Sequence, residues 1–116
     1  MTKASFYNLT FHGIDTIAEV ILNHQLLGYV DNMFVRYSFN VTDILEEENN
    51  MLEVKFTSPI YAALDRANKM REQNATVPPE CPHSRYNGEC HMNMLRKMQA
   101  SFAWDWGPAV PSMGLW

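Results

Sequence analysis

The chain has 116 residues, of which 47% are hydrophobic and 19% charged, and its formal net charge is -4. This length and composition are typical of one globular domain. The acidic balance argues against a nucleic-acid-binding protein, because phosphate neutralisation needs a basic surface, and no apolar run is long enough to suggest a membrane span.

Alternation of apolar and polar residues, which is typical of half-buried β-strands, recurs four times in the first half of the chain. The four segments are residues 6–11, 17–23, 35–41 and 52–56. The following side chains are expected to face inward: Tyr7, Leu9, Phe11, Val35, Tyr37, Phe39, Val41, Leu52, Val54 and Phe56. The stretch at residues 46–50, three glutamates followed by two asparagines, is predicted to form a solvated turn. The pattern indicates a mostly β protein, either an antiparallel sheet with one solvated face or a sandwich.

A helix is predicted after these strands. Ser58 is a favourable cap residue, Pro59 suits a first turn, and residues 61–72 are good helix formers. Further along, residues 92–99 are predicted to form a short helical turn, in which Met94 and Met98 stack one turn apart as core fillers.

Two cysteines, Cys81 and Cys90, lie in a proline-rich loop that also contains a tight-turn pair, Asn87-Gly88. They could form a disulfide, contributing about 2–3 kcal/mol in the chain-entropy model. They could instead bind zinc together with His83 and His91, although the spacing differs from common zinc patterns, or remain as free thiols. The residues alone leave these alternatives open.

Three glycosylation sequons begin at Asn8, Asn40 and Asn74. Together with the two cysteines they favour an oxidising, secretory-pathway origin. The first residues do not have the pattern of a signal peptide. We therefore expect the chain to be a piece of a longer protein.

An unusual triplet, Trp104-Asp105-Trp106, stands before Gly107-Pro108. In a purely structural interpretation, one indole packs in the core and the carboxylate bonds to a turn amide. In a functional interpretation, the indoles stack on the apolar faces of a sugar ring, and the carboxylate accepts bonds from its hydroxyls. The sequence shows neither a nucleophile elbow nor a glycine-rich phosphate loop, and we predict no cofactor.

A family resemblance covers residues 9–116. It is carried by FHGIDTIAEVILNHQLLGYVDNMFVRYSFNVTDIL, NMLEVKFTSPIYAALDRA, VPPECP and GECHMNMLRKMQASFAWDWGPAVPSMGLW. The most specific parts are the Trp-Asp-Trp-Gly-Pro run and the spaced cysteines. These segments resemble the N-terminal domain of the animal lysosomal β-mannosidases, a family within glycoside hydrolase family 2.

The resemblance implies a galactose-binding-like domain, here a partial jelly-roll β-sandwich with one or two short helices. It implies hydrolysis of terminal, non-reducing β-D-mannose residues in glycoprotein-derived oligosaccharides, and a lysosomal location. It also implies that Trp104, Asp105 and Trp106 bind the terminal mannose. Cys81 and Cys90 match a family disulfide.

The resemblance also implies where the catalytic residues are. The family's acid and nucleophile are glutamates on a (β/α)8 barrel, which takes roughly 250 residues. We therefore expect residues 1–116 to be a single, truncated N-terminal domain, inactive alone, whose partners are a β-mannoside oligosaccharide and the enzyme's remaining domains. The alternative is a stand-alone, non-catalytic carbohydrate-binding module.

Overall fold

A computed structural model describes residues 6–77, 90–102 and 110–116, and this part of the chain is mostly β, as predicted. Its strands are β1 (Asn8–Phe11), β2 (Ile14–Asp15), β3 (Ala18–Leu22), β4 (Gln25–Val30), β5 (Tyr37–Asn40), β6 (Leu52–Phe56) and β7 (Gly114–Leu115). Its helices are α1 (Pro59–Glu72) and two 3-10 turns, η1 (Met92–Met94) and η2 (Gln99–Ser101).

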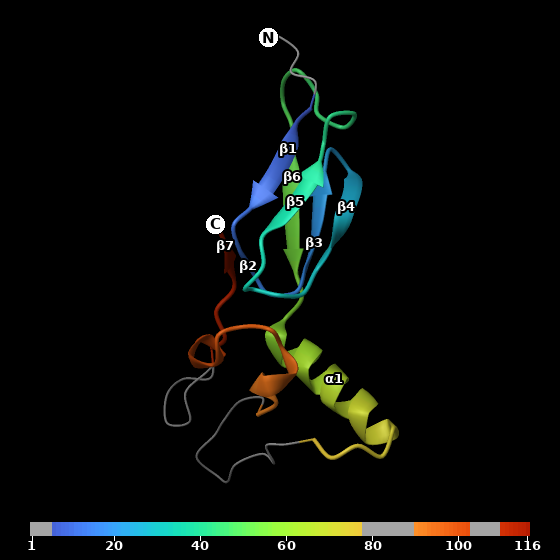
Figure 1. Ribbon diagram of the computed structural model, residues 1–116, viewed down its shortest axis with the longest axis vertical. Helices are drawn as coiled ribbons and strands as arrows, with labels where there is room; N and C mark the ends of the chain where they lie inside the picture. Colours follow the sequence, from blue (N-terminus) through green and yellow to red (C-terminus); the bar gives the residue numbers. More distant parts are fainter. Residues whose placement is uncertain (1–5, 78–89, 103–109) are drawn as a thin grey trace.

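The strands form three small antiparallel sheets. β1 pairs with β5, β2 pairs with β7, and the third sheet has the order β4-β3-β6. In Figure 1 the β1–β5 pair lies across the three-stranded sheet, and α1 lies beyond the end of the strands. The chain end at β7 returns to β2, so the last described residues lie beside some of the first.

The main core fills the space between these sheets. It consists of Phe11, Ile14, Ala18, Val20 and Val30, with half-buried side chains from β1, β4, β5 and β6 packed around it. The rings of Phe11 and Phe39 meet edge to face with centroids 6.4 Å apart, a favourable arrangement for aromatic pairs. Two facing layers are therefore joined by inward side chains, as in a sandwich.

A second cluster joins α1 to the C-terminal region. Ala63 on α1 packs with Leu95 and Phe102, and Ile17 and Met94 are among the half-buried side chains around them. Phe102, the residue just before the segment 103–109, is only 1% exposed and is fixed in this cluster.

The prediction of inward side chains is wrong for two residues, Val35 and Leu52, which are 41% and 44% exposed. Val35 lies two positions before Tyr37, the first residue of β5, so the ladder with β1 does not hold it against the core. Leu52 begins β6, which is an edge strand of its sheet. The remaining predicted inward side chains are buried or half-buried.

The helix prediction is confirmed for α1, which begins at Pro59 and ends at Glu72, although the Ser58 side chain forms no capping bond. The predicted stacking of Met94 and Met98 is wrong. Leu95 has extended dihedrals, so the 3-10 turn η1 stops there and no helix connects the two methionines. Met98 is 52% exposed.

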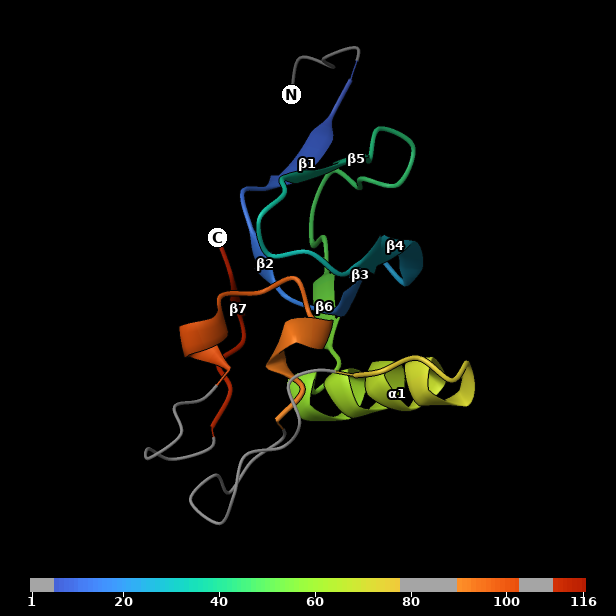
Figure 2. The ribbon, with the colours of Figure 1, turned by 60° about the horizontal axis from the view of Figure 1, so that its bottom comes forward.

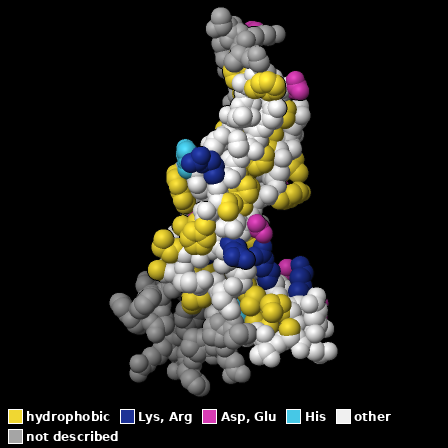
Figure 3. Space-filling model, viewed as in Figure 1, with side chains coloured by type: hydrophobic (Ala, Val, Ile, Leu, Met, Phe, Trp, Pro, Cys, Tyr) yellow, Lys and Arg dark blue, Asp and Glu magenta, His cyan; other side chains and the backbone are white. Residues whose placement is uncertain are grey.

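The molecule is elongated, with extents of 60 × 32 × 21 Å. Large apolar side chains remain exposed on it, among them Phe34 at 66% and Tyr61 at 74%. Figure 3 shows such side chains spread along the strands and near α1 on one face.

The predicted acidic turn is confirmed as exposed over residues 46–50. Among the described helices, none combines the length and the apolar character that crossing a membrane requires.

Candidate functional site

Several predicted site residues, Trp104, Asp105, Trp106, Cys81 and His83, lie outside the described residues. The structure does describe both ends of the segment that contains the Trp-Asp-Trp triplet. The segment follows the buried Phe102 and is followed by Val110. The residues that hold those two ends therefore define the candidate site.

The strand after the segment, β7, forms a short antiparallel ribbon with β2. Asp15 of β2 pairs with Gly114 of β7. The carbonyl of Trp116 accepts bonds from the backbone N–H groups of His12 and Gly13, at 2.8 and 3.2 Å, and Trp116 N donates to Gly13 O at 3.0 Å. The indole of Trp116 lies so close to Gly13 that an added Cβ there would be 2.2 Å from ring atom Cζ2.

A buried ion pair lies behind this ribbon. Lys97 Nζ is 3.2 Å from Oδ1 and 3.3 Å from Oδ2 of Asp15. The Lys97 side chain is fully buried, and that of Asp15 is 7% exposed. The Thr16 hydroxyl donates a further bond to Oδ1 of Asp15. Charges are tolerated at such depth only when they are paired and hydrogen-bonded, as these are.

The same ammonium group binds both ends of the segment. Lys97 Nζ donates to the backbone oxygen of Ser101 at 3.3 Å and to that of Ser112 at 2.9 Å. Ser101 O also accepts a bond from Ser112 N at 2.9 Å. Figure 2 shows the η2 region and the stretch leading into β7 side by side. A lysine has three N–H donors, and this one uses them on the carboxylate and two carbonyls.

Cys90 and His91 are both buried. Cys90 is disulfide-bonded, so its sulfur is not a thiolate ligand for zinc; its pairing with Cys81 stays a prediction. His91 Nε2 lies 2.8 Å from Nη2 of Arg71, and because arginine only donates, Nε2 accepts. The described residues contain no group of three or more His, Cys, Asp or Glu side chains placed to hold a metal ion.

The three sequon asparagines, Asn8, Asn40 and Asn74, are all exposed, as glycan attachment requires. Asn8 and Asn40 are directly opposite each other on β1 and β5. Asn40 Oδ1 accepts bonds from the backbone and hydroxyl of Thr42 at 3.0 and 2.7 Å. Attachment of glycans at these residues stays a prediction.

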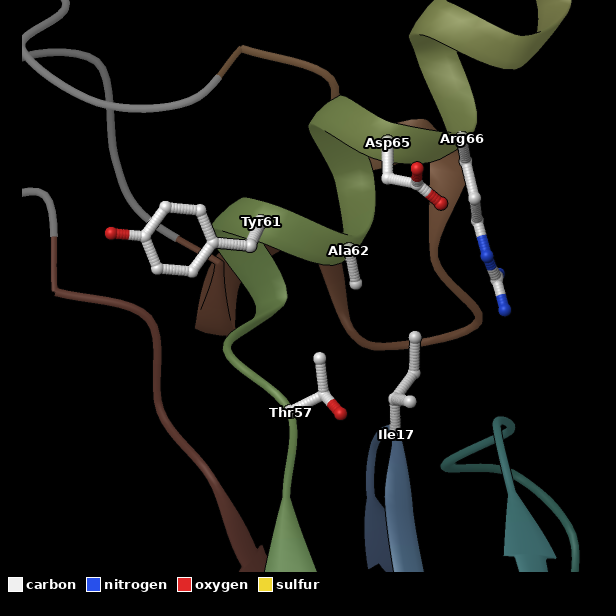
Figure 4. Close-up of a pocket in the computed structure, with 6 residues that line it drawn as sticks. All are labelled: Ile17, Thr57, Tyr61, Ala62, Asp65 and Arg66. Carbon is white, nitrogen blue, oxygen red and sulfur yellow. The ribbon is translucent and has the colours of Figure 1, made fainter.

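A surface pocket of about 390 Å³ lies between α1 and the ends of β3 and β6 (Figure 4). Ile17 and Ala62 face each other in it, whereas the Tyr61 ring points away. Its charged side chains are already paired: Asp65 with Lys69 at 2.6 Å, and Arg66 with Asp31 at 3.4 Å and with Met94 O at 2.9 Å. This pocket is a weaker candidate for a ligand site than the segment above.

Comparison with known families gives the decisive observation. Residues 1–116 match the family described as glycosyl hydrolase 2 galactose-binding domain-like. The chain belongs to this family. The resemblance stated from the sequence and the expected galactose-binding-like fold are thereby confirmed.

Relatives within this family carry a common name. The chain is 47% identical to the β-mannosidase of Capra hircus and 48% identical to that of Bos taurus, each over 116 residues. A crystal structure of β-D-mannosidase from Dictyoglomus thermophilum is 38% identical, with a TM-score of 0.72 over 95% of this chain. The chain spans 13% of the two mammalian relatives and 12% of the bacterial one. A stand-alone carbohydrate-binding module is therefore not favoured.

Sequence reasoning missed the residues that hold the ends of the segment in this glycosyl hydrolase 2 domain. Asp15 and Lys97 are 82 positions apart, and neither belongs to a recognisable motif. The one available signal was a charged residue in an apolar neighbourhood, since Asp15 stands close to Ile14 and Ile17, and Lys97 close to Leu95 and Met98. Such a signal cannot identify the partner.

Proposed function

We propose that this chain is the first domain of a β-mannosidase, and that Trp104, Asp105 and Trp106 form one wall of its mannose-binding site. The observation that supports this most is the match over all 116 residues to enzymes named β-mannosidase, which extends through the triplet. The ends of the segment are also tied together by Ser101, Ser112 and Lys97. A substrate-positioning segment needs such a fixed base.

The residue types suit recognition of a sugar. Pyranose rings have apolar C–H faces that can lie on an indole, and a gain like that of an aromatic pair is about 0.5–1.5 kcal/mol. Each hydrogen bond from a hydroxyl to the Asp105 carboxylate contributes about 1.5–3 kcal/mol. The triplet therefore supplies both apolar contact and orientation at one place.

Bond cleavage itself takes place elsewhere in the proposed enzyme. A retaining glycosidase needs two carboxyl groups about 5–5.5 Å apart, and in the family that this chain resembles these are glutamates of the barrel domain. Binding energy at Asp105 helps to distort the mannose ring toward the transition state. The substrate is then a terminal, non-reducing β-D-mannose residue of a glycoprotein-derived oligosaccharide. We place the enzyme in the lysosome, with the remaining domains as partners and a Cys81–Cys90 disulfide.

Kinetics of the full-length enzyme that contains this domain test the proposal. Asp105→Ala is expected to lower kcat/KM for an aryl β-mannoside by about 10- to 150-fold for each hydrogen bond lost. Asp43→Ala is the matched control, because Asp43 is an exposed aspartate in the turn after β5. Equal kinetics for the two variants would contradict the proposal.

A further inference from the structure

We propose that Lys97 is a positioning residue for the Trp104–Trp106 wall, acting with Asp15 to fix both ends of the segment that contains it. This inference rests on the function proposed above. The buried Lys97–Asp15 pair lies outside the triplet, and no sequence motif identifies it.

One ammonium group, Nζ of Lys97, donates to Ser101 O at 3.3 Å and to Ser112 O at 2.9 Å. These two carbonyls stand on opposite sides of the segment and are 11 positions apart. Any displacement of Nζ therefore disturbs both ends of the segment at once.

Neighbouring residues fix the position of Lys97 itself. Its carboxylate partner, Asp15, belongs to β2, which pairs with β7. The residue before it, Ile14, is completely buried in the main core. Phe102, whose ring centroid is 6.0 Å from Nζ, is fixed in the second cluster. The ammonium group is thus located relative to both cores of the described structure.

A buried ion pair is a poor way to gain stability. Apolar residues of similar volume are often as stabilising or more so. What an ammonium group provides and an apolar side chain cannot is a set of three directed bonds, here to one carboxylate and two main-chain oxygens. These directed bonds are what a residue that orients the backbone needs.

Asp105 lies close in the sequence to a carbonyl group that Lys97 binds. Asp105 is four positions after Ser101. A misplacement of about 1 Å at a substrate-positioning group costs about 100-fold in rate. Loss of the Lys97 bonds is therefore expected to impair sugar binding even though Lys97 does not touch the substrate.

The test is made in the full-length enzyme, with rates normalised to folded protein. Lys97→Met is expected to lower kcat/KM for an aryl β-mannoside about 10- to 100-fold and to weaken inhibition by mannose. Val20→Ala is the matched control, because it removes buried volume from β3 in the main core without touching the segment. It should lower the melting temperature while leaving both kinetic readouts unchanged.

Two further variants separate positioning from folding. The double variant Asp15→Leu with Lys97→Met replaces the pair by apolar side chains, which should preserve stability. If Lys97 positions the segment, this variant stays slow although it is folded. Wild-type kinetics in it, or in Lys97→Met, would overturn the inference.

A double-mutant cycle with Asp105→Ala keeps the two proposals distinct. If Lys97 acts through Asp105, adding Lys97→Met to Asp105→Ala lowers kcat/KM by much less than it does alone. Full additivity would overturn the positioning role. An Asp105→Ala variant with normal kinetics would instead contradict the proposed function, whatever Lys97→Met does.

Discussion

The ammonium group of Lys97 lies 3.2 Å from a carboxylate oxygen of Asp15, and the two buried side chains are 82 positions apart in the sequence. This pair connects the β2–β7 ribbon to the backbone on either side of the Trp-Asp-Trp segment. Among the described residues, every buried side-chain polar atom has a hydrogen-bond partner. Removal of one member of the pair would break that condition.

Asp15→Asn is expected to destabilise the domain strongly, because it leaves the buried Lys97 ammonium without a countercharge. Breaking a buried pair from one side costs about 3–5 kcal/mol. Asp65→Asn is the control, since its pair with Lys69 is 2.6 Å long but has side chains 59% and 67% exposed. Such exposed pairs contribute about 0–1 kcal/mol. Scanning calorimetry of the full-length enzyme should show a lower melting temperature for Asp15→Asn alone; equal values for the two variants would refute the prediction.

Gly13→Ala is expected to displace the Trp116 indole, because the new Cβ would be 2.2 Å from its ring. Overpacking of this kind costs about 1–3 kcal/mol, and here it would loosen the β2–β7 ribbon. Gly114→Ala is the matched control on the partner strand, since a Cβ there would have no atom within 4 Å. Thermal unfolding of both variants checks this, and a Gly114→Ala protein as unstable as Gly13→Ala would count against the packing argument.

The sequons at Asn8 and Asn40 are expected to compete for glycans. The two asparagines are directly opposite on β1 and β5, where Cβ atoms are only about 4.5–5.5 Å apart. Two branched glycans leaving from such close points would overlap. Glycopeptide mass spectrometry of protein from mammalian cells should find few doubly modified chains, and Asn8→Gln should raise occupancy at Asn40 but not at Asn74. Full occupancy of both residues would show that the strands tolerate two glycans.

Much of the fold was predictable from the sequence, because the signals are local. The strands β1, β3, β5 and β6 have a clear alternation of apolar and polar residues, and Pro59 indicates the first turn of α1. The strand β4 was missed because Leu26 and Leu27 are adjacent before Gly28, which breaks the alternation, and its pairing with β3 shifts register between Val20 and Ile21. The strands β2 and β7 have two residues each, too few for any periodicity to appear.

The candidate site was predictable only in its chemistry. The order Trp-Asp-Trp suggests a sugar because of the side chains themselves. What holds the segment is a set of contacts from Lys97 to Asp15, Ser101 and Ser112. Two of these contacts are made to main-chain oxygens, which every residue has, so the residue types at these positions do not indicate the contacts. Such contacts follow from the tertiary structure and not from any sequence pattern.

The most direct test of the central claim is a crystal structure of the full-length enzyme with mannose bound. The proposal predicts that a carboxylate oxygen of Asp105 lies about 2.5–3.0 Å from mannose hydroxyls, with an indole of Trp104 or Trp106 on a face of the sugar. An Asp105 carboxylate engaged in an ion pair within the domain, with both indoles turned away from the bound mannose, would contradict it.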